Sequence, residues 1–297
     1  MIVVKLMGGL GNQMFQYAFG KFLSVKHNTD LQLDLSYLLD RTPRENFVFR
    51  DYDLDIFPIK SQFMSESKLN NLLVNRQKDN IVNRLKGVFN KHLEYVFESQ
   101  FEFNNKYLDI ANHSYLEGYW QSPKYFESIS EIIRKDFLLN PDLTDKQVDM
   151  YKNIINSNSV CVNFRRADFV TIKTAIETHG VIPQIYYEKA LDLLKKKNKD
   201  LHVYVFSDEI DWCKKHVKFD YPTTFVDHEL SGFKFSVYLF LMSKCKHYVI
   251  PNSTFAWWAA WMNNNPDKIV IAPKQWFATE EMNKQTIDLI PESWIRL

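Results

Sequence analysis

The sequence predicts an α/β protein of two domains, and two observations support this. The first forty residues form the pattern strand, glycine-rich turn, helix, strand, which is the opening of a βαβ unit. After a proline and polar cluster at 140–147, which indicates a boundary or the start of a bridging helix, a second alternation of strands and helices begins. A chain of 297 residues is long enough for two domains with separate cores. We expect the division to fall between residues 153 and 154.

The elements of the first half follow from apolar spacing. The run IVVKL at 2–6 predicts a strand, the stretch 13–27 carries apolar residues at helical spacing, and LQLD at 31–34 predicts a second strand. Helix-like spacing continues over about 62–98. The segment HSYLEGYWQSPKYF at 113–126 indicates a strand that leads into a loop.

Four β-branched runs in the second half are typical of strands buried on both faces of a parallel sheet. Polar residues follow three of these runs, and in open α/β sheets ligands bind beyond the carboxyl ends of the strands. We therefore expect the three polar clusters to meet in one crevice. The runs are 160–164, 202–207, 246–250 and 268–273, and the clusters are Arg165, Arg166 and Asp168, then Ser207, Asp208 and Glu209, then Asn252, Ser253 and Thr254.

Composition excludes several classes of partner and location. Lys and Arg number 37 against 36 Asp and Glu, so no overall charge favours nucleic acid or an anionic membrane. No apolar run reaches about 18 residues, and we expect neither a membrane-spanning helix nor a signal peptide. The three cysteines are scattered and lack zinc-site spacing. The expected location is the cytoplasm, with at most peripheral association with the inner face of a bacterial plasma membrane.

The segment PNSTFAWWAAW at 251–261 predicts an anion seat. Free amides of a first helical turn, the helix dipole and the hydroxyls of Ser253 and Thr254 can all point at a phosphate. The alternative is that one of these residues is only a helix N-cap. Arg165 adds a guanidinium at the end of a neighbouring run. We expect its partner to be a ligand phosphate and not a buried carboxylate.

Other nucleotide chemistries fit less well. The segment GGLGNQ at 8–13 lacks the GK[ST] ending of a P-loop and the spacing of a dinucleotide fingerprint. No HExxH or DxD pair is present, and the doublet Asp208-Glu209 is weak support for a metal. Glycosyl transfer from a nucleotide sugar remains, with two α/β domains, a diphosphate seat and no metal.

Seven segments spread over nearly the whole chain resemble the α-1,2-fucosyltransferases of glycosyltransferase family 11. Together these segments are highly specific for that family. They are GGLGNQMFQYAFG at 8–20, EGYWQS at 117–122, NFRRADF at 163–169, THGVIPQIYYEKAL at 178–191, FSDEIDWCKK at 206–215, LMSKCKHYVIPNSTFAWWAAW at 241–261 and KIVIAPKQWF at 268–277.

The resemblance implies a GT-B-like fold, in which two Rossmann-like domains face each other across a cleft. Residues 1–153 would form the acceptor-side domain and residues 154–297 the nucleotide-sugar-binding domain. The implied donor is GDP-L-fucose, the implied acceptor is the 2-hydroxyl of a galactoside on a surface or lipid-linked glycan, and transfer would invert the anomeric carbon without a metal or other cofactor. Oligomeric state is not readable.

The resemblance also assigns site residues. Gly11, Asn12 and Gln13 match the family's Gly-Asn-Gln loop, which faces the cleft. Arg165 matches the first arginine of the family's His-x-Arg-Arg-x-Asp motif and is expected to bind the β-phosphate. The helix start that completes the phosphate seat corresponds to Ser253, Thr254 and Phe255. The donor-binding set also includes Asn163, Ser207, Asp208 and Asn252.

Two departures from the family concern recognition of the base. Asn163 replaces the motif histidine, and Val237-Tyr238 replaces a Glu-Asp pair. Asparagine can still hydrogen-bond guanine, whereas Tyr238 cannot replace a carboxylate that accepts from it. We expect GDP to bind more weakly than in a relative with both residues, but ahead of UDP or TDP.

The general base is open among three residues. Asp168, Glu177 and His179 are the candidates, and Lys173 occupies the position where some relatives carry a glutamate. Each candidate also has a structural interpretation: an arginine partner, a solvated loop charge and a loop-packing residue. A different nucleotide sugar, or a binding protein without turnover, remains an alternative to fucosyl transfer.

Overall fold

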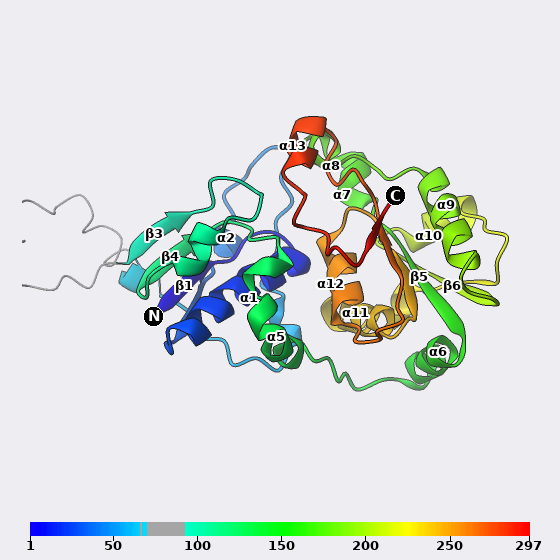
Figure 1. Ribbon diagram of the computed structural model, residues 1–297, viewed down its shortest axis with the longest axis horizontal. Helices are drawn as coiled ribbons and strands as arrows, with labels where there is room; N and C mark the ends of the chain where they lie inside the picture. The colour runs from blue at the N-terminus through cyan, green and yellow to red at the C-terminus, as the bar shows by residue number, and fades with distance from the viewer. Residues whose placement is uncertain (66, 70–92) are drawn as a thin grey trace, which may run out of the picture. The chain divides into compact units, whose positions relative to one another are not determined.

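A computed structural model describes residues 1–65, 67–69 and 93–297, which fold into two compact units (Figure 1). Helix α6 (Asp145–Asn156), in which the expected division at residue 153 falls, belongs to the second unit. The first unit comprises Met1–Pro43, Phe49–Asp55 and Ile59–Asp136, and the second comprises Arg44–Val48, Ile56–Pro58 and Phe137–Leu297.

The first unit is built on a four-stranded parallel sheet of order β2-β1-β4-β3. Gly8 makes the turn from β1 into α1 with a φ of +74°, and a Cβ there would meet the Asn12 side chain at 2.4 Å, so the turn requires glycine. The elements are β1 (Ile2–Lys5), α1 (Leu10–Lys26), β2 (Leu31–Asp34), α2 (Ser36–Leu39), β3 (Glu94–Phe97), β4 (Ser114–Glu117) and α5 (Ser130–Asp136), with 3-10 turns at Leu54–Ile56, Asn105–Asp109, Pro123–Tyr125 and Glu127–Ile129.

The second unit contains a six-stranded parallel sheet of order β10-β9-β8-β5-β6-β7. Helix α6 begins with a capping box in which Thr144 and Gln147 satisfy each other's backbone amides. The elements after α6 are β5 (Asn158–Phe164), α7 (Ala167–Thr171), α8 (Lys173–His179), α9 (Gln184–Lys195), β6 (Leu201–Ser207), α10 (Ile210–His216), β7 (Thr223–Phe225), α11 (Ser236–Ser243), β8 (His247–Val249), α12 (Thr254–Met262), β9 (Val270–Ala272), α13 (Glu280–Lys284) and β10 (Ile295–Arg296), with 3-10 turns at His228–Leu230 and Phe233–Phe235.

Burial on both faces explains the apolar strands of this sheet. Val160, Val162 and Phe164 of β5 pack into a core with residues of α9 and α10. Helix α12 is apolar on nearly every side because its tryptophans are buried and it packs against α11 (Figure 1). Trp257 and Trp258 are fully buried, so they belong to the core.

The predicted α/β class with parallel sheets is confirmed, and most elements lie where the sequence places them. The helix expected over 13–27 begins at Leu10. The helix-like interpretation of 62–98 is wrong at Glu94–Phe97, which forms β3, and much of it lies outside the described residues. Strands β7 and β10 were not predicted, because they are short and only partly buried.

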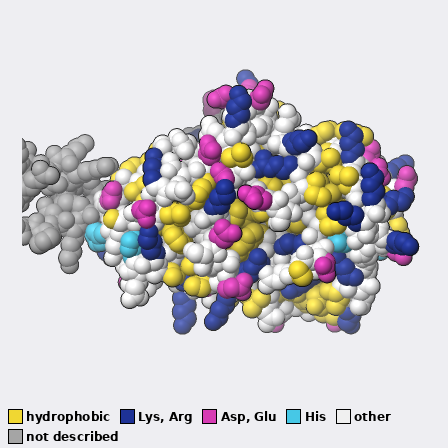
Figure 2. Space-filling view, viewed as in Figure 1, with side chains coloured by type: hydrophobic (Ala, Val, Ile, Leu, Met, Phe, Trp, Pro, Cys, Tyr) yellow, Lys and Arg dark blue, Asp and Glu magenta, His cyan; other side chains and the backbone are white. Residues whose placement is uncertain are grey.

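Surface charge follows the composition. Basic and acidic side chains are interspersed over the face shown in Figure 2. Within the described part of the chain, we find no helix with the length and apolar character needed to cross a bilayer.

Candidate functional site

The expected polar clusters lie at one edge of the second sheet. Strand β5 pairs with β6 on one side and with β8 on the other, all in parallel register. Their carboxyl ends therefore open onto the same edge, where Arg165, Asp208 and Asn252 follow the three strands.

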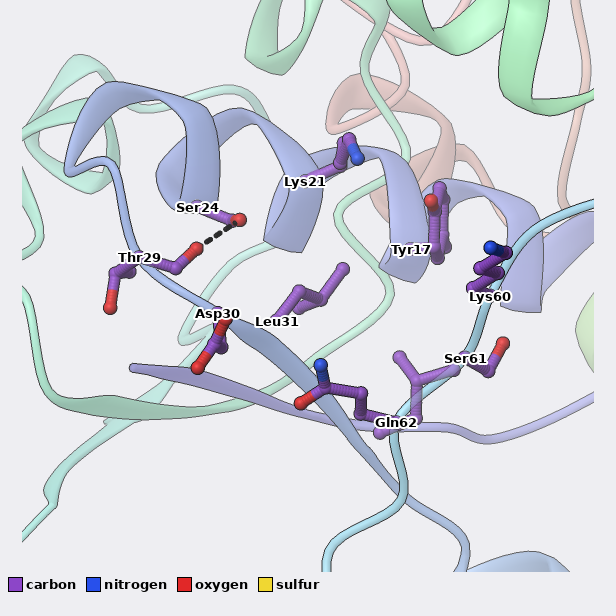
Figure 3. A pocket seen from close by; sticks show the side chains of 10 residues that line it. Tyr17, Lys21, Ser24, Thr29, Asp30, Leu31, Lys60, Ser61 and Gln62 are labelled. Atoms are coloured by element: carbon purple, nitrogen blue, oxygen red, sulfur yellow. Dashed lines mark hydrogen bonds between the residues drawn. The ribbon is translucent and has the colours of Figure 1, made fainter.

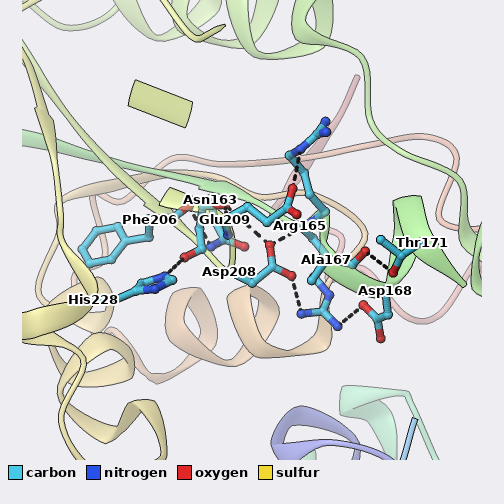
Figure 4. Close-up of polar contacts among 11 residues, drawn as sticks. Asn163, Arg165, Ala167, Asp168, Thr171, Phe206, Asp208, Glu209 and His228 are labelled. Carbon is cyan, nitrogen blue, oxygen red and sulfur yellow. Dashed lines mark hydrogen bonds and ion pairs between the residues drawn. The ribbon is translucent and has the colours of Figure 1, made fainter. Parts of the chain in front are cut away.

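Arg165 is the centre of this cluster (Figure 4). Its Nη1 donates to Asp208 Oδ2 at 2.6 Å, and its Nη2 donates to Asp168 Oδ1. The guanidinium also lies over the Phe169 ring at 5.2 Å. Arg165 therefore has two partly exposed carboxylate partners in the chain, because α7 brings Asp168 beside it and the β5–β6 register brings Asp208. Its binding of a ligand phosphate stays a prediction.

Arg166, the next residue, contacts Asp208 and Glu209. Its backbone amide donates to Asp208 Oδ1 at 2.9 Å, and its Nε donates to Glu209 Oε2 at 3.0 Å. Its guanidinium stacks 3.4 Å from the centre of the Trp212 ring. Glu209 accordingly neutralises Arg166, and the doublet Asp208-Glu209 serves the two arginines.

Burial and neighbouring positive groups have opposite effects on the pKa of Asp208. Burial raises the pKa of its carboxyl, while Arg165 and the Arg166 amide oppose that rise. The Arg165 side chain is 24% exposed and that of Asp208 19%, so the pair is reachable from solvent. Such a pair can exchange partners with a ligand more readily than a fully buried pair can.

The start of α12 is the second half of the expected anion seat. Ser253 is the N-cap residue by backbone position, but its side chain makes no capping hydrogen bond. The interpretation of Ser253 as a side-chain N-cap is therefore not supported. Thr254 and Phe255 form the first turn of this helix, whose amides lie next to the end of β8.

The Asn252 side chain hydrogen-bonds two backbone segments of the second unit. Its Nδ2 donates to the backbone oxygen of His179 at 2.9 Å and of Trp276 at 3.0 Å. Its Oδ1 is buried and has no hydrogen-bond partner among the described residues. Asn252 thus ties His179 to the edge of the sheet while keeping an unused acceptor.

The Phe169 ring lies next to both His179 and the Arg165 guanidinium. His179 stacks on Phe169 with ring centres 4.6 Å apart, and Phe277 lies 5.5 Å from it on another side. Burial lowers the pKa of His179 to about 4, with the nearby Asp168 carboxylate opposing this and Arg165 adding to it. His179 is therefore neutral at pH 7, and its Nδ1 is buried with no hydrogen-bond partner in the part of the chain that the structure describes.

Glu177 lies apart from these contacts. Its side chain is 63% exposed, and its carboxylate is 3.8 Å from Lys173 one helical turn away. This is the arrangement of a solvated surface pair.

The residues expected to read the base are both largely buried. Asn163 donates from Nδ2 to the Phe206 backbone oxygen at 3.2 Å, and it is 7% exposed. Tyr238 is 2% exposed, and its hydroxyl donates to the backbone oxygen of Val226. The Tyr238 hydroxyl is thus used inside the fold.

The sequence did not reveal an aromatic loop after β7. Gly232, Lys234 and Phe235 have φ values of +70°, +48° and +60°, a left-handed conformation that is costly for the two non-glycine residues. Phe233 is 67% exposed and Phe235 is 41% exposed. The run SGFKFS carries one glycine but no other signal of this geometry.

His228 connects this loop to the arginine cluster. Its Nε2 lies 2.8 Å from the Ser207 backbone oxygen and donates to it, and Ser207 immediately precedes Asp208 (Figure 4). Its ring packs edge-on against Phe235 at 5.6 Å. Ser207 itself accepts from the Glu209 amide at 2.9 Å.

The glycine-rich loop belongs to the first unit. Gln13 is fully buried, and its side chain bonds the backbone of Gly8, Asp51 and Asp53 at 2.8 to 2.9 Å. Asn12 is partly exposed and accepts from Gln121 Nε2 at 3.0 Å. Gly11 is a buried residue of α1. The side chain of Gln13 therefore braces the loop, and Asn12 is the member that reaches the surface.

No cluster of three or more His, Cys, Asp or Glu side chains with the geometry of a metal site occurs among the residues described here. The three cysteines are buried and free.

The described residues form two α/β units with parallel sheets, and the second sheet carries an arginine cluster at its carboxyl edge. The chain belongs to glycosyltransferase family 11, whose sequence model matches residues 1–297. It is an enzyme of the α-1,2-fucosyltransferase-like type.

Bacterial relatives match over nearly their full length. The O-antigen biosynthesis glycosyltransferase WbnK of Escherichia coli is 36% identical over 98% of this chain and 99% of that protein. An alpha-1,2-colitosyltransferase of Escherichia coli is 32% identical over 100% of this chain and 98% of that protein. Among solved structures, the alpha-1,6-fucosyltransferase NodZ co-crystallized with GDP is 12% identical, with a TM-score of 0.49 over 87% of this chain and 91% of that chain.

Proposed function

We propose that this enzyme transfers L-fucose from GDP-fucose to the 2-hydroxyl of a galactoside, with inversion, during synthesis of a surface glycan. Membership of family 11 and the relative named for O-antigen biosynthesis support this proposal. The observation that carries it is the Arg165 guanidinium held at the sheet edge by Asp168 and Asp208. The first unit would take the acceptor and the second the nucleotide sugar.

In the proposed reaction an acceptor hydroxyl attacks C1 of the sugar, the bond from C1 to the β-phosphate oxygen breaks, and GDP leaves. The charge that develops on the β-phosphate would be met by Arg165 and by the amides of Thr254 and Phe255, whereas the Ser253 amide donates to the Pro251 oxygen at 2.8 Å. Arg165 has five N–H donors and uses two of them on carboxylates, so donors remain for a phosphate. One preorganised donor of this kind contributes about 10²- to 10³-fold to turnover.

His179 is the base candidate that the proposal keeps. Asp168 is paired with Arg165, and Glu177 is solvated beside Lys173. His179 is neutral at pH 7, so a ring nitrogen can accept a proton, but burial lowers its pKa to about 4 and makes it a weak base. His179→Phe keeps the aromatic stack but removes both nitrogens, so we expect kcat to fall about 10²-fold or more with GDP affinity unchanged. Unchanged kcat would remove His179 from this role.

For the nucleobase we propose a stacking surface formed by Phe233 and Phe235. Both rings are exposed, and the loop is linked through His228 to the backbone beside Asp208. Stacking does not discriminate strongly between bases. Specificity for guanine would then rest on backbone groups and on Asn163, and we expect GDP to bind only moderately ahead of UDP and TDP.

A second candidate donor is GDP-colitose, favoured by the relative named as a colitosyltransferase. Colitose is fucose without the 3-hydroxyl, so the two sugars differ by one polar contact. Parallel assays of GDP-fucose, GDP-colitose, UDP-galactose and TDP-rhamnose with a β-galactoside acceptor separate the candidates. Transfer from GDP-fucose above the others is expected. Transfer only from a UDP- or TDP-sugar would contradict the fucosyl assignment.

The alternative of a binding protein without turnover needs a separate pair of measurements. Isothermal titration with GDP, followed by an assay of GDP release, distinguishes binding from catalysis. GDP binding without release of product would contradict the transferase proposal. We further propose action on a lipid-linked acceptor from the cytoplasmic side, with at most peripheral membrane association.

A further inference from the structure

A polar groove lies in the first unit and shares no residue with the Arg165 cluster (Figure 3). Helix α1 contributes Tyr17, Lys21 and Ser24, which are spaced along one face of the helix. The opposite wall is formed by Lys60, Ser61 and Gln62, and the start of β2 forms the floor. The volume is about 270 Å³, slightly below that of pockets for drug-sized ligands, which suits one or two sugar rings.

Both walls of the groove are anchored. Leu33 of β2 donates its amide to the Gln62 oxygen at 2.8 Å and accepts from the Met64 amide at 2.9 Å, so the wall extends the edge of the sheet. Ser24 Oγ donates to the Thr29 oxygen at 2.6 Å, which fixes the end of α1 (Figure 3). The groove is therefore formed before any ligand binds.

The lining offers hydrogen-bond donors and acceptors with little apolar surface. It presents the amines of Lys21 and Lys60, the amide of Gln62, the carboxylate of Asp30 and several hydroxyls. Among the described residues, the side chains of Lys60 and Gln62 make no hydrogen bond or ion pair within the chain. A ligand whose groups both donate and accept matches this lining, and saccharide hydroxyls do so.

The groove carries charges of both signs. Lys21 lies 3.5 Å from Asp136 Oδ2, which also accepts from the Tyr17 hydroxyl at 2.8 Å. Lys60 and Asp30 both line the groove, and the Met1 amine lies near enough to Asp30 to interact with it electrostatically. The hydroxyl groups of a neutral saccharide can donate to a carboxylate and accept from amines, so this mixed lining suits a neutral ligand.

We propose that this groove is a second carbohydrate-binding site, which holds one or two neutral sugar units. The choice of a glycan rests on the proposed function, since a glycan-extending enzyme meets saccharides longer than its reacting unit. The site would retain the glycan without touching the reacting atoms.

The test is an amide-resolved NMR titration of the full chain with N-acetyllactosamine, in the presence of saturating GDP. We expect shifts at Thr29, Ser61 and Gln62. The double substitution Lys60→Ala and Gln62→Ala should weaken this binding about three- to tenfold, the loss expected for one or two hydrogen bonds. Lys135→Ala, an exposed lysine outside the groove, is the matched control and should leave the affinity unchanged.

Inorganic phosphate is titrated in parallel. Shifts of the groove amides with phosphate and not with the sugar would overturn the proposal, as would the absence of groove shifts with N-acetyllactosamine. A transfer assay on the same sample keeps the two proposals separate. Fucosyl transfer without groove shifts contradicts only the second site, and groove shifts without transfer contradict only the proposed function.

Discussion

The carboxyl edges of the two parallel sheets differ in how their polar groups are satisfied. In the first unit, the buried side chains of Gln13 and Gln16 bond backbone groups around the glycine turn at 2.8 to 3.1 Å. In the second unit, Arg165 and Arg166 are held by carboxylates of Asp168, Asp208 and Glu209, all partly exposed.

We interpret the buried glutamines of the first unit as structural groups and the arginines of the second unit as groups available to a ligand. Neutral amide bonds to the backbone lock a loop, since breaking one leaves a buried group unpaired. Partly exposed ion pairs can exchange a carboxylate for a phosphate at lower cost, because solvent reaches both partners. Equivalent positions in two similar sheets thus serve different purposes.

The largest effect is expected at Arg165. Arg165→Ala should lower kcat by about 10²- to 10³-fold or more and weaken GDP binding, because the main donor to the β-phosphate is removed. Arg165→Lys should restore little, since an ammonium cannot form two parallel bonds. Turnover assays and titration with GDP measure both effects.

Because Asp208 loses its counter-charge in Arg165→Ala, a decrease in melting temperature is also expected. The double variant Arg165→Ala with Asp208→Asn controls for this and should recover stability without activity. Near-normal turnover in the single alanine variant would exclude Arg165 from the site.

The reverse pattern is expected at Gln16 of the first unit. Its Oε1 accepts from the Met7 amide at 2.9 Å, and its Nε2 donates to the Gly118 oxygen at 3.1 Å. Gln16→Leu leaves both groups unpaired, at a cost of about 1–3 kcal/mol each in the free energy of unfolding. Denaturant unfolding measures the loss. GDP affinity at a temperature where the variant is folded should not change, and a large loss of affinity would contradict the comparison.

Glu98, which follows β3 at the first edge, is a partly buried carboxylate. It accepts from the amides of Tyr119 at 2.6 Å and Trp120 at 3.1 Å, and burial raises its pKa to about 7 despite these bonds. The folded protein therefore holds this proton more tightly than the unfolded chain. The free energy of unfolding should fall as pH rises from about 4.5 to 7, by at most about 3 kcal/mol.

Glu98→Gln should flatten the pH dependence of stability in that range. Glu94→Gln, an exposed residue of β3, the strand that precedes Glu98, is the control and should keep the slope. Thermal unfolding across the pH range measures both, and an unchanged slope in Glu98→Gln would show that another group is responsible.

The smallest effect is expected from metal removal. Arg165 keeps N–H donors beyond its two carboxylate bonds, and the start of α12 adds backbone amides, so a diphosphate can be bound without a metal. Transfer should therefore continue at full rate in excess EDTA. Activity lost in EDTA and restored by Mn²⁺ or Mg²⁺ would contradict this expectation.

The sequence was sufficient for features that depend on local pattern. The apolar runs at 160–164 and 202–207 predicted strands β5 and β6, since strands buried on both faces are apolar throughout. The order of strands and polar clusters also placed Arg165 and Asp208 at one edge. Short strands with little burial, such as Thr223–Phe225, carried too weak a signal.

Tertiary structure alone decided what each polar side chain does. Gln13 and Asn12 are neighbours in the same motif, yet one is buried as a brace and the other reaches the surface. Arg165 gained carboxylate partners, one of them 43 residues away in the chain, through the register of two strands. Side-chain roles depend on burial and on long-range partners, and a sequence pattern records residue type and spacing but not which distant atoms fill the remaining hydrogen bonds.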